Sequence, residues 1–99
     1  MPKETTMIHD PQRVELMRSG IAKGLRRISA IEAKLIGKTT GLREQLAHAR
    51  NHFNDVELNY LSFLDKQERT PQQEARWLNS ADMHLAVAIT ETDLIEKLI

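Results

Sequence analysis

The sequence predicts an all-α protein whose three long amphipathic helices form an antiparallel up-down-up bundle or coiled coil. Apolar residues recur at spacings of three and four through three long stretches, which is the period of one helix face. Short polar segments that contain Gly or Pro separate these stretches, and short connections make neighbouring helices antiparallel. With 99 residues, we expect a flexible N-terminal segment over residues 1–8 and a single three-helix domain over residues 9–99.

The first helix is expected over residues 11–36. Asp10 is a good N-cap acceptor, and Pro11 suits the first helical position, where its missing N–H costs nothing. Gly20 and Gly24 interrupt the pattern, each at a cost of up to about 1 kcal/mol relative to Ala. They either allow a close helix approach or are simply tolerated in a long helix. The apolar face consists of Val14, Met17, Ile21, Ile28, Ile31 and Leu35, widened by Leu25 and Ile36.

The second helix is expected over residues 41–64. Gly37 suits a left-handed C-cap for the first helix, and Thr39 or Thr40 can cap the second. A single α-helical period then runs through the whole stretch. Its apolar face consists of Leu42, Leu46, Ala49, Phe53, Val56, Tyr60, Phe63 and Leu64.

The third helix is expected over residues 71–98. Thr70 as N-cap, Pro71 at the first helical position and Gln73 at the third match a capping box. The apolar face that follows consists of Leu78, Ala81, Leu85, Ala88, Ile89, Thr92, Ile95 and Ile99.

A second apolar row on this third helix carries the functional prediction. At 100° per residue its members lie within about 60° of each other, opposite the first apolar face. Because a helix of a lone three-helix bundle buries only one stripe, we expect a non-enzymatic module for protein–protein interaction. Such a small adaptor, regulator or inhibitor would self-associate through this row or dock it on a target protein. The alternatives are a centrally placed third helix or scattered surface residues. The second apolar row consists of Met83, Val87, Leu94 and Leu98.

Charge is unevenly distributed along a chain with zero net charge. Residues 12–50 carry nine basic and three acidic side chains, whereas residues 51–99 carry four basic and nine acidic ones. A basic stripe on the first helix could bind an anionic ligand, a nucleotide or a nucleic acid, which is the alternative function. It could equally be a solvated face that balances the acidic third helix. The basic stripe consists of Lys23, Arg27, Lys34 and Lys38, in line with Arg13.

The polar side of the second helix carries the one pattern typical of metal ligands. His48 and His52 have the i, i+4 spacing that lets two imidazoles reach one ion, with Glu44 and Asp55 on the same side. Further ligands could come from His9, Asp10 or His84. Since histidine pairs on a polar face are usually solvated, we expect neither a metal nor a cofactor.

Arg43 and His48 have an Arg-x4-His spacing that resembles the signature of the HEPN family of helical ribonucleases. The resemblance implies that His48 acts as acid and base while Arg43 steadies the scissile phosphate. No nucleophile elbow accompanies the scattered Ser, His and Asp residues, so an enzyme is the less favoured class.

Composition bounds the cellular setting. Cysteine is absent, which suits a reducing compartment. The sequence shows no apolar leader, and its apolar runs are too short for a membrane span. We therefore expect a cytoplasmic protein that has no contact with membranes.

Overall fold

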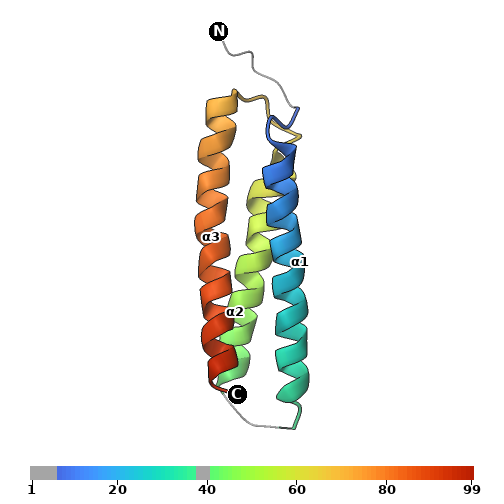
Figure 1. Ribbon diagram of the computed structural model, residues 1–99, viewed down its shortest axis with the longest axis vertical. Helices are drawn as coiled ribbons and strands as arrows, with labels where there is room; N and C mark the ends of the chain where they lie inside the picture. Colours follow the sequence, from blue (N-terminus) through green and yellow to red (C-terminus); the bar gives the residue numbers. More distant parts are fainter. Residues whose placement is uncertain (1–6, 38–40) are drawn as a thin grey trace.

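The computed structural model describes residues 7–37 and 41–99 as an elongated three-helix bundle measuring 58 × 18 × 16 Å. Helices α1 (Pro11–Lys34), α2 (Leu42–Asp55) and α3 (Pro71–Lys97) lie along the long axis and alternate in direction, so that α1 and α3 run downward and α2 runs upward in Figure 1. α2 is continued by a π-helical turn, η1 (Val56–Tyr60), and a 3-10 turn, η2 (Leu61–Phe63). The predicted all-α antiparallel bundle is confirmed.

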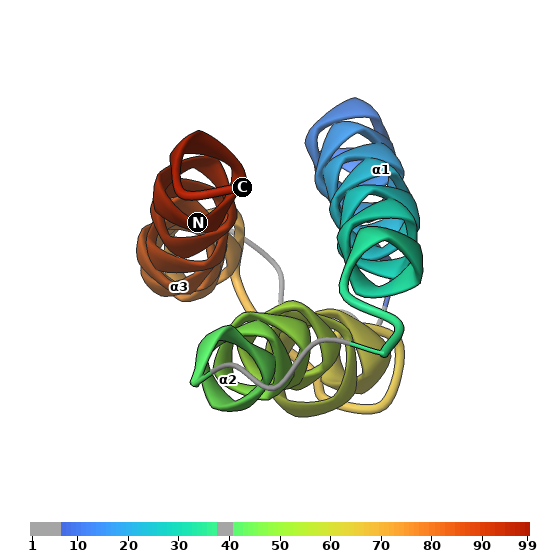
Figure 2. The same ribbon diagram turned by 90° about the horizontal axis from the view of Figure 1, so that it is seen from below.

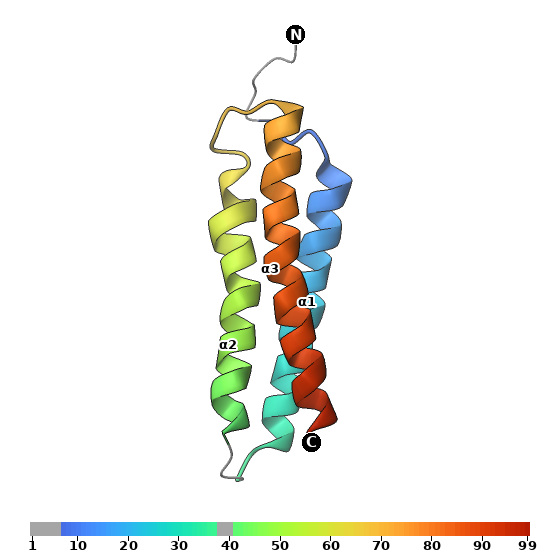
Figure 3. The same ribbon diagram turned by 90° about the vertical axis from the view of Figure 1, so that its left-hand side faces the viewer.

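The three helices occupy the corners of a triangle when the bundle is seen along its axis (Figure 2), and every pair of them is in contact. Figure 3 shows α3 in front of α1 and α2, so one side of α3 faces away from both. The core between the helices contains most of the predicted apolar faces. Three isoleucines were wrongly predicted to extend these faces: Ile36, Ile89 and Ile99 are exposed.

The end of the second helix departs from the predicted α-helix over residues 41–64. Across the π-helical turn η1, Leu61 follows Val56 by five positions, and both are buried. A π-turn adds one residue to the α-helical repeat and so moves the next core position along by one. Leu61 therefore takes the core position predicted for Tyr60, which is half-buried, while Phe63 is exposed.

The helix starts at Pro11 and Pro71 follow the predicted chemistry. The Asp10 side chain accepts a hydrogen bond from the Arg13 N–H at 3.2 Å. Thr70 and Gln73 form the complete capping box, each side chain bonding the backbone N–H of the other residue.

The turn between α1 and α2 was predicted in part. Gly37 has φ of 79°, the left-handed conformation expected of a C-cap glycine. Gly41, rather than a threonine, stands at the N-cap of α2, so the predicted threonine cap is wrong. Thr39 and Thr40 themselves lie outside the described residues.

Gly24 allows α1 and α2 to approach closely. A Cβ atom built on Gly24 would lie 2.2 Å from Cζ of Phe53, a side chain that is fully buried. At Gly20 a Cβ atom would meet Leu85 at 3.7 Å, an ordinary van der Waals contact. The close approach considered for both glycines therefore applies to Gly24 alone.

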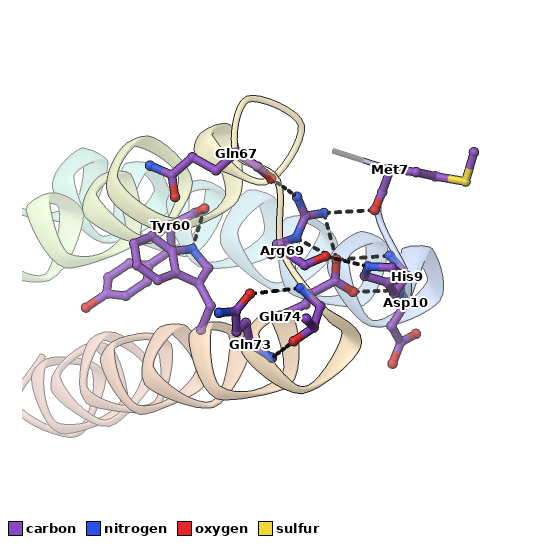
Figure 4. A network of polar contacts seen from close by, with 10 residues as sticks. Met7, His9, Asp10, Tyr60, Gln67, Arg69, Gln73 and Glu74 are labelled. Carbon is purple, nitrogen blue, oxygen red and sulfur yellow. Dashed lines mark hydrogen bonds and ion pairs between the residues drawn. The ribbon is translucent and has the colours of Figure 1, made fainter. Parts of the chain in front are cut away.

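A buried polar network holds the start of α1 against the start of α3 (Figure 4). Glu74 is 1% exposed and accepts hydrogen bonds from the backbone N–H groups of His9 and Asp10, at 2.9 and 2.7 Å. Arg69, also buried, pairs with the same carboxylate at 2.7 Å. The Met7 carbonyl accepts a further bond from Arg69, and Ile8 packs against the core. Residues just before α1 are thus attached to the domain.

Candidate functional site

The second apolar row lies on the side of α3 that faces away from the other helices. Its members are exposed by 44% to 72%, whereas the opposite face of α3 is buried. None of the four therefore belongs to the hydrophobic core. The structure thus places Met83, Val87, Leu94 and Leu98 on one open helix surface.

Leu94 also lines a groove between α2 and α3. The groove has a volume of about 470 Å³, and its lining residues include no Lys or Arg. α2 and α3 lie next to each other along this groove. Glu44 and His48 line it from α2, and Glu91 lines it from α3. The lining residues are Glu44, Gln45, His48, Glu91, Leu94 and Ile95.

A histidine cluster, made of His48, His52 and Glu91, lies along this groove. One potential ligand atom from each residue lies within 4.8 Å of the other two. His52 Nε2 is 3.8 Å from Glu91 Oε1, and the two imidazole rings are 5.9 Å apart. Glu91 Oε2 is buried without a hydrogen-bond partner among the described residues. Two α2 imidazoles and an α3 carboxylate therefore converge on one point.

Aromatic rings continue from the histidine cluster along the bundle. His84 stacks on His52 with ring centres 6.4 Å apart and also contacts Tyr60 at 5.3 Å. Tyr60 in turn contacts Trp77 at 5.2 Å. His84 thus lies beside the cluster without belonging to its donor set.

The basic stripe of α1 is partly occupied by acidic residues of α3. Arg27 forms ion pairs with Asp93 and Glu96, and Arg13 pairs with Asp82. Hydrogen bonds to Glu96 and Asp93 raise the pKa of Arg27 above its ordinary value, and the hydrogen bond from Arg27 lowers the pKa of Glu96. The contacts of Arg27 match the alternative in which the stripe balances the acidic third helix.

The remaining stripe residues differ in what the structure shows of them. Lys23 and Lys34 are exposed on α1. Lys38 lies outside the described residues. Of the described stripe, two lysines therefore face solvent and Arg27 is engaged.

Arg43 and His48 point to different neighbours. Nη2 of Arg43 donates to the Leu35 carbonyl at 2.9 Å, on the side of α2 next to α1. His48 lies on the α3 side with Glu91. The arrangement does not bring the two side chains of the Arg-x4-His spacing together.

The comparisons with known proteins give no relative for this chain. Comparison of the chain with protein-family models, curated proteins and solved structures found no match. Among the described residues, no helix combines the length and apolar character needed to cross a bilayer.

Sequence reasoning found two members of the histidine cluster but missed the third. His9 and Asp10, which were considered as further ligands, bond Glu74 near the start of α1 instead. Glu91 was missed because its position opposite His52 depends on how α3 is aligned against α2. Its only sequence signal is its spacing of seven residues from His84, which places both on one face of α3.

Proposed function

We propose that this chain is a non-enzymatic helical interaction module that self-associates through the second apolar row of α3. One observation carries the proposal: four large apolar side chains lie together on a helix face that the chain's own core does not cover. Clustered apolar surface of this kind marks an interaction site more often than isolated exposed residues do. Such a module suits a small adaptor, regulator or inhibitor.

The spacing within the row favours another helix as the occupant. Together with exposed Thr90, the row follows intervals of four, three, four and four residues from Met83 to Leu98. The first three intervals alternate as in the seam of a coiled coil, and Leu98 follows one helical turn after Leu94. The seam extends over about 22 Å at 1.5 Å per residue and contains no charged side chain.

A second copy of this chain fits the seam. In an antiparallel two-fold pairing, Met83 of one copy would face Leu94 of the other, and Val87 would face Thr90. A symmetric pairing of this kind uses the same patch twice, as two-fold interfaces do. Zero net charge means that two copies do not repel each other at long range.

The free energy available from burying the row is of the same order as the cost of association. Fully burying a Leu, Val or Met side chain stabilises by about 1.5–3 kcal/mol, and roughly half of that remains to be gained because each side chain is already partly covered. The six side chains that meet in this pairing, Met83, Val87 and Leu94 of each copy, would contribute about 7 kcal/mol, against an association cost of about 4–15 kcal/mol. A single exposed apolar residue could not meet that cost.

The cellular setting of the proposal is the cytoplasm. The sequence contains no cysteine, as suits a protein of a reducing compartment.

Sedimentation velocity over a range of concentrations tests the proposal. We expect the wild-type mass to rise toward two copies, while a Val87→Glu/Leu94→Glu variant stays monomeric with an unchanged circular dichroism spectrum. The matched control, Leu16→Glu/Ile36→Glu, adds the same two charges at exposed apolar positions outside α3 and should still dimerise. A wild type that stays monomeric throughout, or a control that dissociates equally, would overturn the proposal.

A further inference from the structure

We propose that the histidine cluster binds one divalent transition-metal ion of the Zn²⁺ class between α2 and α3. Its three ligands do not belong to the second apolar row, although Leu94 of that row lines the same groove. The site also departs from the sequence-based expectation of solvated histidines, because the structure adds Glu91 to the pair.

The geometry needs only small side-chain movements. Zinc bonds to His nitrogen and carboxylate oxygen at about 2.0–2.2 Å, which puts tetrahedral ligand atoms roughly 3.4 Å apart. The three ligand atoms of the cluster already lie within 4.8 Å of one another. His48 is exposed, while His52 and Glu91 are half-buried, so side-chain rotations can close the difference without moving either helix.

Glu91 provides evidence independent of the histidine spacing. Its Oε2 atom is buried and has no hydrogen-bond partner within the described part of the chain. A buried carboxylate oxygen without a partner is unfavourable, because it has lost its hydration and gained nothing in return. A cation held by the same carboxylate would remove this penalty.

The donor set indicates the class of metal. Two imidazoles and one carboxylate suit Zn²⁺ and related first-row ions, whereas Mg²⁺ and Ca²⁺ prefer oxygen ligands. Glu44 lines the same groove one turn before His48 and offers a carboxylate for the fourth position or for a metal-bound water. Because the ligands come from two helices, bound metal would cross-link α2 to α3.

Titration of untagged protein with Zn²⁺ alone, followed by isothermal calorimetry and thermal unfolding, tests the site. We expect one ion per chain and a rise in Tm. The His52→Ala and Glu91→Gln variants should each bind Zn²⁺ at least tenfold more weakly. Glu91→Gln keeps the size of the side chain, so a folded variant without the charge is available even if His52→Ala disturbs the packing.

His84→Ala is the matched control, since His84 stacks on His52 but supplies none of the three ligand atoms. This variant should bind Zn²⁺ within about twofold of the wild type. Absence of binding by the wild type, unchanged affinity in Glu91→Gln, or an equal loss in His84→Ala would each overturn the proposal. Co²⁺ in place of Zn²⁺ should give the absorption bands of a tetrahedral nitrogen and oxygen site in the wild type and in His84→Ala, and should lose them in His52→Ala and Glu91→Gln.

Discussion

The Arg69 guanidinium and the Glu74 carboxylate form an ion pair almost wholly excluded from water, with side-chain exposures of 7% and 1%. Two nitrogens of Arg69 bond the same Glu74 oxygen, at 2.7 and 2.9 Å. The other Glu74 oxygen accepts from the Asp10 N–H. One carboxylate therefore joins the segment before α1, the loop after η2 and the first turn of α3.

Removing the arginine should be strongly destabilising. We expect Arg69→Met to lower the free energy of unfolding by about 3–5 kcal/mol, because it leaves a buried carboxylate without its cation. The double variant Arg69→Met/Glu74→Gln should lose less, since it leaves no buried charge, although the single amide oxygen replaces only one of the two oxygens that accept from the His9 and Asp10 N–H groups. Urea denaturation measures both. Arg76→Met, at an exposed position of α3, should stay within about 0.5 kcal/mol of wild type.

Stability should fall in acid through Glu74. Burial alone would raise the pKa of Glu74, but hydrogen bonds from His9, Arg69 and Asp10 outweigh burial and hold it below its ordinary value. Between the ordinary glutamate pKa and the lower pKa of Glu74 in the folded protein, the unfolded chain binds more protons than the folded chain. The free energy of unfolding therefore falls as the pH drops through this range.

The pH effect can be assigned by substitution. Urea denaturation between about pH 5 and pH 3 should show a shallower acid slope for Glu74→Gln than for wild type. The acid slope of Glu96→Gln provides the comparison. The pKa of Glu96 is also lowered, but Glu96 lies at an exposed position where solvent screens its pairing with Arg27. Equal slopes for wild type and Glu74→Gln would contradict the assignment.

The two glycines of α1 should respond oppositely to alanine. Gly24→Ala places a methyl group against the buried Phe53 ring and should destabilise by about 1–3 kcal/mol through overpacking. Gly20→Ala meets only an ordinary contact and should stabilise by about 0.5–1 kcal/mol through helix propensity. Thermal unfolding of the two variants measures both changes in stability. Destabilisation by both would show that the contact with Phe53 is not the cause.

Freeing Arg27 should expose the basic stripe. In Asp93→Asn/Glu96→Gln, Arg27 loses both of its acidic partners, so retention on a heparin column should extend to higher salt. The control Asp65→Asn/Glu68→Gln makes the same change in net charge at exposed positions outside the helices and should shift retention less. Identical shifts would mean that net charge alone governs binding to polyanions.

Local chemistry explains how much of the fold could be predicted. Asp10 and Thr70 cap their helices through hydrogen bonds to residues three positions away. The local sequence is therefore enough to locate the N-termini of α1 and α3. The π-turn was missed because Tyr60 and Phe63 also fit an uninterrupted α-helical period. Burial of Glu74 was missed because it depends on Arg69 and on His9, which lies 65 residues away.

The candidate sites divide in the same way. Spacing along one helix located His48 and His52 and the second apolar row, since positions on a single helix face follow from its period. The partners that lie across helices, Glu91 for His52 and Asp93 for Arg27, required the alignment of α3 against α1 and α2. Periodicity alone does not determine that alignment.

Trp77 donates its indole N–H to the Tyr60 carbonyl at 2.8 Å, at the point where the π-helical turn ends. It is the sole tryptophan of the chain, so its fluorescence is a built-in optical reporter of that junction. Local opening at this junction would expose the indole to water and shift its fluorescence emission to longer wavelength. The far-ultraviolet circular dichroism signal of the long helices would persist. Local opening of this junction can therefore be distinguished from global unfolding of the bundle without attaching any dye.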